Sequence, residues 1–345
     1  MATIDDVARA SGVSKSTVSS VFSRKRPISK EVTERVLAAA KRLNYKPNYW
    51  ARSLANRSTR IIGLNLRGES FKFGQFQLSL LNGVLSACYA HGYRLLVNSL
   101  SEAFSSQVEH MTSSPVDGEI ILDPESGDVR IEERIVGGVP VVIIGRPPKP
   151  YESQISYVDN DNAGMAELVT RHLLGMGHRD ILFLNAPAVR TVAADRAAGY
   201  WNAFRAIGLE PDKELLVHHL PESGSEGLSS YDFARETVVK LLEARRGVTA
   251  VIADSDTMAL GVYKAAELCR RRIPGELSVL AFSDDSVLFP EFSPPLTGVR
   301  LHAEQLGMEA AKLLIGQLSE SANAVRRVLV QAGLVVRGSC SGPPR

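Results

Sequence analysis

The clearest chemical signal in this sequence is the segregation of its charges. Of the 40 Lys and Arg and 38 Asp and Glu in the chain, 13 and 4 lie in residues 1–60, which gives that arm a net charge of +9 and the remainder −7. Basic side chains that neutralise phosphates release condensed counterions and supply affinity for a polyanion. The arm therefore indicates a nucleic-acid partner, although charge alone also allows a solvated basic tail.

Side chains of the kind that contact bases and phosphates follow Ser14. Ser14 can cap a helix, and that helix would carry Lys15, Ser16, Thr17 and Ser20 on one face. In a helix-turn-helix motif, such a face lies in the DNA major groove. We therefore predict that this face reads DNA.

The elements that would position this helix are also present. Thr3 and Asp6 fit a capping box, which predicts a first helix running through Ser11. Gly12 allows positive φ in the turn that follows. Ala8, Gly12 and Val18 have the spacing that a helix-turn-helix needs. Because this spacing also occurs in ordinary helical hairpins, plain helix packing stays open at this point. The apolar side chains that can close the small core are Ile4, Val7, Ala8, Val13, Val18 and Val21.

Two further helical segments complete the arm. Ser29 can cap a third helix over residues 31–43, whose apolar residues form a stripe, and residues 44–48 break it. Residues 48–55 favour a helix of about two turns, which is too short to be stable alone in water. We expect this last segment to need a partner in order to fold.

From Ile61 onward, short apolar runs alternate with amphipathic stretches of helix length, which is typical of βα units in a parallel sheet. Because these runs are too many for one small sheet, two similar lobes are predicted. Ligands of such lobes bind at the carboxyl ends of the strands, in the cleft between them. The predicted strands are 61–66, 93–98, 118–122, 139–144, 180–184, 248–253 and 277–282.

Several other chemistries are disfavoured. The sequence has no H-E-x-x-H, G-x-S-x-G or G-x-x-x-x-G-K-[ST] motif, and His218 and His219 have no carboxylate or Cys at metal-ligand spacing. Cys88, Cys269 and Cys340 are too scattered for a disulfide framework or a zinc site. No apolar run approaches the roughly 18 residues that span a bilayer, and the first residues do not resemble a signal peptide. We therefore predict a cytoplasmic protein with no catalytic residues, cofactor or metal.

Motifs along nearly the whole chain occur in a specific order. The arm contains T-I-D-D-V-A-R-A-S-G-V-S-K-S-T-V-S from residue 3, then N-Y-K-P-N, A-R-S-L-A and I-I-G-L. The body contains V-D-G-E-I-I-L at 116–122, V-P-V-V-I-I-G-R at 139–146, D-N-A-G at 161–164, L-L-G-M-G-H-R-D-I at 173–181, A-A-D-R-A-A-G-Y at 193–200, D-T-M-A-L-G at 256–261 and S-P-P-L-T at 293–297. Together these motifs resemble the LacI/GalR family of bacterial transcription regulators.

The resemblance implies a domain organisation. Residues 1–46 would form a helix-turn-helix DNA-binding domain, residues 47–60 a hinge helix and linker, and residues 61–345 a two-lobed effector-binding and dimerisation domain with the fold of periplasmic sugar-binding proteins. Three chain crossings place the N-lobe at about 61–160 and 293–321, and the C-lobe at about 161–290 and 322–340.

The resemblance also implies how the arm meets DNA. The family inserts the side chain at the position of Leu54 into the minor groove, where such a wedge kinks the duplex. The predicted DNA-binding residues are Thr3, Ser14, Lys15, Ser16, Thr17, Ser20, Ser29, Tyr45, Asn48, Ala51 and Leu54.

The same resemblance places an effector between the lobes. In the family, an Arg at the position of Arg196 hydrogen-bonds the effector, and carboxylates occupy the positions of Asp161 and Asp256. From the residues alone, a surface arginine is the more expected interpretation of Arg196, Asp161 could belong to an acidic turn, and Asp256 could cap a helix as well as bind an effector. The predicted effector-binding residues are Phe71, Phe73, Asp161, Arg196, Asp256 and Asp284.

The chain also departs from the family pattern. Ser255 replaces a common Asn, Gly145 replaces an Asp, and Leu301 stands where Gln is usual. These changes remove polar groups that a hydroxyl-rich ligand needs, so an unmodified hexose or disaccharide is less expected here than in the family in general. Ser20 stands where a relative carries a base-contacting Arg, so the operator sequence cannot be copied.

The overall prediction is an N-terminal all-α helix-turn-helix domain and an α/β body of two doubly wound lobes. It would be a homodimeric transcription regulator, most often a repressor in this family, on pseudo-palindromic operator DNA. We expect a small-molecule effector, no membrane contact, and a short disordered end at 339–345 without the heptads of a tetramer. An α/β enzyme with a basic tail and a sugar-binding transport protein are the alternatives.

Overall fold

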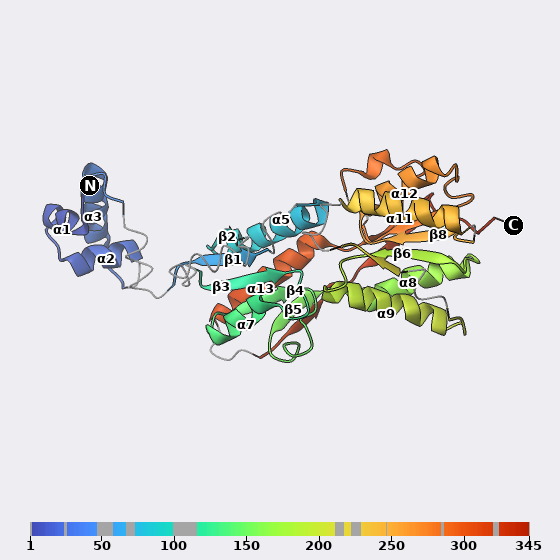
Figure 1. The fold of residues 1–345 in the computed structure, drawn as a ribbon. Helices are drawn as coiled ribbons and strands as arrows, with labels where there is room; N and C mark the ends of the chain where they lie inside the picture. The colour runs from blue at the N-terminus through green and yellow to red at the C-terminus, as the bar shows by residue number, and fades with distance from the viewer. Residues whose placement is uncertain are drawn as a thin grey trace. The chain divides into compact units, whose positions relative to one another are not determined.

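The computed structural model divides the chain into two compact units, Met1–Thr59 and Arg60–Arg345. It describes residues 2–23, 26–46, 58–66, 73–98, 116–210, 217–221, 229–245, 247–283, 286–319 and 324–344. The elements of both units are labelled in Figure 1. None of the helices in these ranges is long and apolar enough to cross a membrane.

The first unit contains the helices α1 (Ile4–Ser11), α2 (Lys15–Ser23) and α3 (Lys30–Arg42). The predicted capping box is confirmed, because Asp6 N donates to Thr3 Oγ1 and Thr3 N donates to the Asp6 carboxylate at 2.9 Å. Gly12 ends α1 with φ +64°, which turns the chain into α2. Val7, Val18 and Val36 are fully buried in the core that these helices share.

The first lobe of the body has the strand order β11-β5-β4-β3-β1-β2. Alternate strand residues face opposite sides, so Ile120 packs toward α5 (Gln75–Ala90) and α13 (Ala303–Ser319), whereas Ile121 packs toward α7 (Val129–Val136). Figure 1 shows α5 and α13 lying side by side on this lobe. The strands are β1 (Ile61–Asn65), β2 (Arg94–Asn98), β3 (Gly118–Leu122), β4 (Val141–Ile144), β5 (Ser156–Asp159) and β11 (Arg327–Leu329).

The second lobe has the strand order β12-β10-β9-β8-β6-β7. Leu182 and Leu184 pack toward α11 (Ser230–Ala244) and α12 (Asp256–Leu268), whereas Ile181 and Phe183 pack toward α8 (Asn162–Gly175) and α9 (Thr191–Arg205). Helices thus cover both faces of each sheet, as the prediction of doubly wound lobes requires. The strands are β6 (Ile181–Asn185), β7 (Val217–His219), β8 (Ala250–Ala253), β9 (Ser278–Ala281), β10 (Thr297–Arg300) and β12 (Gly333–Val335).

Two predicted lobe boundaries are wrong. Strand β10 lies in the range assigned to the N-lobe, yet it pairs with β9 in the second sheet. Strand β11 lies in the range assigned to the C-lobe, yet it pairs with β5 in the first sheet. The chain crosses after β5, between β10 and α13, and between β11 and β12. A strand of three or four residues has too short a pattern to predict its partner, so the sheet that it joins is decided by the backbone hydrogen bonds that it forms with a neighbouring strand.

The carboxyl-terminal segment is ordered against the second lobe, so the expected disordered end is wrong for residues 339–344. Ser339 is fully buried, donates to Val279 O and accepts a hydrogen bond from Thr297 N. Ser341 N donates to Ser278 Oγ, and Ser341 O lies 2.8 Å from Nε2 of His178. These bonds fasten the segment along β9 and β10.

Candidate functional site

The predicted DNA-reading face lies at the start of α2. Ser14, Lys15 and Ser16 are exposed, and Thr17 and Ser20 are half-buried. Ser14 Oγ accepts a hydrogen bond from Thr17 N at 3.2 Å and so caps the helix, as predicted. Lys15 Nζ lies 3.0 Å from the exposed carboxylate of Asp5, a contact that a phosphate can replace. The face therefore presents hydroxyl and ammonium groups to solvent.

Three other predicted DNA-binding residues have structural roles in this unit. Thr3 and Ser29 are exposed and cap α1 and α3, and Ser29 Oγ accepts from Val32 N. Tyr45 is half-buried against Phe22, with ring centroids 5.9 Å apart. Both caps lie at helix amino termini, where backbone amides favour a phosphate. The predictions for Asn48, Ala51 and Leu54 lie outside the described residues.

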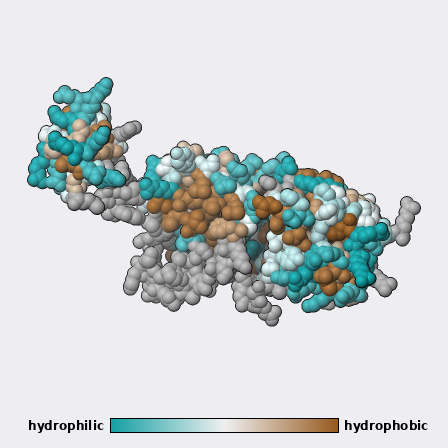
Figure 2. Space-filling model, turned by 90° about the horizontal axis from the view of Figure 1, so that it is seen from above, coloured by the Kyte–Doolittle hydropathy of each residue, from teal (hydrophilic) through white to brown (hydrophobic). Residues whose placement is uncertain are grey.

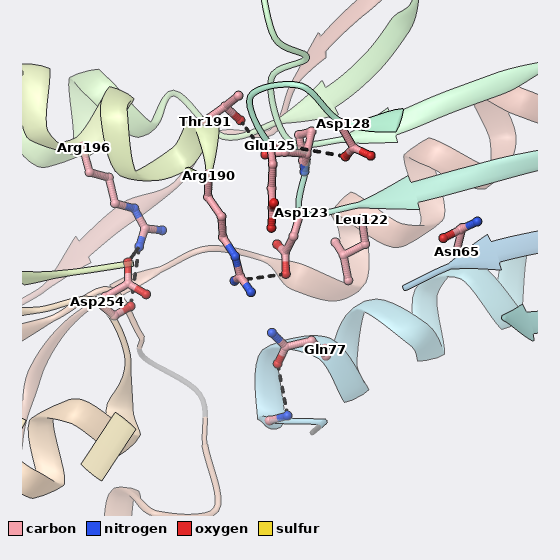
Figure 3. Close-up of polar contacts among 12 residues, drawn as sticks. Asn65, Gln77, Leu122, Asp123, Glu125, Asp128, Arg190, Thr191, Arg196 and Asp254 are labelled. Carbon is pink, nitrogen blue, oxygen red and sulfur yellow. Dashed lines mark hydrogen bonds and ion pairs between the residues drawn. The ribbon is translucent and has the colours of Figure 1, made fainter. Parts of the chain in front are cut away.

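Of the predicted effector residues, Arg196 lies at the carboxyl end of β8, where it binds Asp254. Arg196 on α9 is only 6% exposed, so it is not a surface arginine. Its Nε donates to Asn162 Oδ1 at 3.0 Å, its Nη1 donates to Asp254 Oδ1, and its guanidinium lies 4.0 Å from the centre of the Phe282 ring. Figure 3 shows the Arg196–Asp254 pair together with Arg190 and Asp123. The guanidinium is thereby fixed in orientation.

The other predicted effector residues that the structure describes differ in burial and in their hydrogen bonds. Asp161 caps α8 by accepting from Gly164 N at 2.9 Å and is exposed. Asp256 is half-buried, and Ser255, not Asp256, is the capping residue of α12. Phe73 is 42% exposed and therefore is not lobe core. Phe71 and Asp284 lie outside the described residues, and the effector contacts of the whole set stay predictions.

Asp159 and Asn162 connect Arg196 to the first lobe. Asp159 ends β5, and its Oδ1 accepts from Asn162 Nδ2 at 2.9 Å, while Asn162 Oδ1 accepts from Arg196. Burial raises the pKa of Asp159 to about 7. A continuous path of hydrogen bonds therefore runs from the first sheet through Arg196 to Asp254 in the second.

Two ion pairs join the lobes directly, and the sequence analysis did not predict them. Arg146 donates from Nη2 to Asp195 at 2.7 Å, and this hydrogen bond raises the pKa of Arg146. Arg190 Nη1 lies 3.3 Å from Asp123 Oδ2, as Figure 3 shows. Arg146 ends the motif at 139–146 and Arg190 precedes the motif at 193–200, but their partners are 49 and 67 residues away.

Arg190 has one further property. Its Nε is buried and has no hydrogen-bond partner among the described residues. A buried donor without an acceptor is unfavourable by about 1–3 kcal/mol, so an oxygen atom of a ligand or water would be stabilising there. Within the same residues, no group of three or more His, Cys, Asp and Glu side chains could hold a metal ion.

Two stretches of the chain match known families. Residues 3–48 match the family described as "Bacterial regulatory proteins, lacI family", and residues 170–340 match the "Periplasmic binding protein-like domain". The first stretch contains α1, α2 and α3. The second runs from α8 to the carboxyl-terminal segment.

Similarity to individual proteins extends over the full length. "HTH-type transcriptional regulator CelR" of Thermobifida fusca is 31% identical over 345 residues, covering 98% of each chain. "Ribose operon repressor" of Escherichia coli (strain K12) is 30% identical and covers 98% of this chain and 100% of its own. The solved "transcriptional regulator CelR-cellobiose complex" has a TM-score of 0.74 at 29% identity and covers 98% of this chain and 100% of its own. A lac repressor dimer bound to operator superposes with a TM-score of 0.81 at 23% identity, covering 99% of each chain, which supports the fold.

Proposed function

We infer a specific role from the fact that this chain belongs to the lacI family of bacterial regulatory proteins. It is a DNA-binding transcription regulator and not an enzyme. The role that we propose is that of a cytoplasmic homodimeric repressor on a pseudo-palindromic operator. Its operator affinity is set by a small carbohydrate-like effector that binds between the two lobes, and no cofactor takes part.

The observation that carries the DNA-binding part is the exposed face of α2. Its hydroxyl and ammonium groups are held by a small helical core, and the helix begins at a side-chain cap. Such a helix can enter the major groove while the helix amino termini meet phosphates. The net charge of +9 on residues 1–60 adds affinity that does not depend on base sequence.

The effector part is supported by Arg196. A buried guanidinium, fixed by Asn162 and Asp254 and stacked on Phe282, can donate to a ligand hydroxyl without first being ordered. Arg190, with its unpartnered buried Nε, offers a second donor from the same lobe. The names of two relatives point to sugars, because one is a ribose operon repressor and another was solved with cellobiose.

An apolar surface on the first lobe supports the dimer. Leu78, Leu85 and Tyr89 on α5 are exposed, and so are Leu96 and Val97 on β2. Figure 2 shows apolar side chains gathered on the face of the first lobe that carries these two elements. A contiguous apolar patch on a water-soluble body favours an interface. A two-fold dimer would place two copies of α2 on two half-sites.

The proposal is tested by selecting duplexes from a random library with the full chain. We expect enrichment of a pseudo-palindrome, loss of all selection in residues 61–345 alone, and strong salt dependence of binding. In the full chain, Ser16→Ala should weaken the selected duplex far more than random DNA, whereas Lys41→Gln on the exposed side of α3 should weaken both by a similar small factor. Failure to enrich any sequence would refute the DNA-binding part.

The effector part has a separate test. A ligand that binds only the native body raises its melting temperature. We expect at least one neutral sugar or related metabolite, from a panel that includes cellobiose and ribose, to raise it in the full chain. The same ligand should shift the affinity for the selected duplex. A ligand that raises the melting temperature but leaves DNA affinity unchanged would contradict its role as effector.

A further inference from the structure

One loop of the first lobe is docked on the start of α9 in the second. We call residues 123–128, which follow β3, the docking loop. Ser126 N donates to Val189 O at 2.9 Å, and Thr191 N donates to Pro124 O at 3.2 Å. These two backbone hydrogen bonds cross between the lobes in opposite directions. Figure 3 shows the loop facing residues 190 and 191.

Arg130 supports the docking loop from within the first lobe. Arg130, in the first turn of α7, donates from Nη2 to Leu122 O at 3.2 Å and to Asp123 O at 3.3 Å. It also pairs with Asp128 through Nε at 2.9 Å and Nη2 at 2.7 Å. Asp128 is 2% exposed and accepts as well from Glu125 N at 3.4 Å. A single guanidinium thus binds both ends of the docking loop.

The backbone at the start of the loop explains why such support is needed. Asp123 has φ +54°, a conformation that few residues other than glycine adopt and that Asp and Asn tolerate best. This turn directs the Asp123 side chain to Arg190 of the second lobe, 3.3 Å away. Arg130 binds the carbonyl oxygen of Asp123. The position of the Asp123–Arg190 ion pair therefore depends on Arg130, although Arg130 contacts neither Arg190 nor Arg196 in the hydrogen bonds described.

We propose that Arg130 is a positioning residue for lobe closure: it holds the strained turn at Asp123 so that the docking loop stays bonded to the start of α9. Arg130 makes these contacts from two separate nitrogens, Nε and Nη2, of one rigid plane, which the single nitrogen of a lysine cannot reproduce, so lysine does not replace it. The docking contacts themselves do not rest on the proposed function. Its consequence for effector response, through closure around the effector, rests on the proposed function.

Hydrogen–deuterium exchange in the full chain, without DNA or ligand, tests the docking directly. Arg130→Met and Arg130→Lys should speed exchange of the Ser126 and Thr191 amides at least about tenfold, because their cross-lobe bonds open more often. The strand β6 serves as an internal reference.

Arg134→Met is the matched control. Arg134 lies one turn further along α7 and is similarly buried, at 18% exposed against 12% for Arg130. It pairs with the buried Glu119 at 2.7 Å, away from the docking loop. We expect this variant to lower the melting temperature by a similar amount yet leave exchange at Ser126 and Thr191 within about twofold. Equal acceleration by Arg134→Met, or none by the Arg130 variants, would overturn the proposal.

A second substitution tests the route through Asp123. Asp123→Asn keeps a residue that tolerates the turn but removes the charge that pairs with Arg190. It should speed exchange in the same two segments without altering exchange in α7. If Arg130 acts through Asp123, the double variant accelerates exchange by less than the product of the single effects. A fully multiplicative result would mean that the two residues act separately and that Arg130 does not position Asp123.

Discussion

Replacing Arg196 with methionine should destabilise the second lobe strongly. The substitution keeps an apolar chain that can pack on Phe282 but removes the charge. Asp254, 19% exposed at its side chain, then loses its cation, and Asn162 Oδ1 loses its donor. Since Arg196 is buried and paired, the experiment measures what this ion pair contributes to the stability of the second lobe.

The magnitude follows from the contacts. Removing one partner of a buried ion pair is unfavourable by about 3–5 kcal/mol, and the partial exposure of Asp254 favours the lower end, about 3 kcal/mol. With a urea dependence of about 3 kcal/mol per M, the unfolding midpoint should fall by about 1 M. Arg196→Met with Asp254→Asn should recover part of this loss, since the orphaned carboxylate is then also gone.

The assay is urea unfolding followed by Trp201 fluorescence. Trp201 lies on α9 next to Tyr200, and the chain has 2 Trp, so Trp50→Phe leaves it as the sole reporter. Arg235→Met is the control, because Arg235 pairs with Asp232 at 2.9 Å on the surface and contributes about 0–1 kcal/mol. A midpoint for Arg196→Met equal to that of the control would refute the reasoning that its ion pair orders the second lobe.

Two further predictions concern the lobe junction and the helix contacts. Burial raises the pKa of Asp159 from 3.8 to about 7, so its neutral form adds stability that is complete below about pH 4 and is lost as the pH rises through 7. The urea midpoint should therefore fall between pH 4 and 7 in the wild type more steeply than in Asp159→Asn, and equal slopes would contradict the shift. A methyl group on Gly83 of α5 would overlap the carbonyl oxygen of Glu304 on α13, whereas one on Gly316 meets nothing within 4 Å. By thermal unfolding, Gly83→Ala should lose about 1–3 kcal/mol and Gly316→Ala gain up to about 1 kcal/mol, and the opposite order would show that α5 and α13 do not pack this closely.

The features that the sequence predicted well are those made by residues near one another in the chain. The two residues of the capping box, Thr3 and Asp6, are only three positions apart, and the turn at Gly12 needs only the conformational freedom of glycine. Strands such as 118–122 are buried on both faces, so their apolar runs are continuous and recognisable without knowing their neighbours. The family motifs also indicated a body of two lobes and pointed to Arg196, whose effector contact stays a prediction.

The features that the sequence missed depend on partners far along the chain. Strands β10, β11 and β12 have only three or four residues, and their sheet is decided by the strands that they happen to meet. No local pattern marks Ser339 as buried, because its hydrogen bonds run to Val279 and Thr297.

The same division holds at the candidate site. The sequence determined that an arginine follows β6 within a recognisable motif, because a motif is a property of neighbouring residues. Only the tertiary structure decided that this arginine binds Asp254, 58 residues away, and that Arg190 meets Asp123 across the lobes at a separation of 67. Ion pairs of this kind form where two chain segments are brought together by packing, and the free energy that joins the segments comes from cores that lie elsewhere.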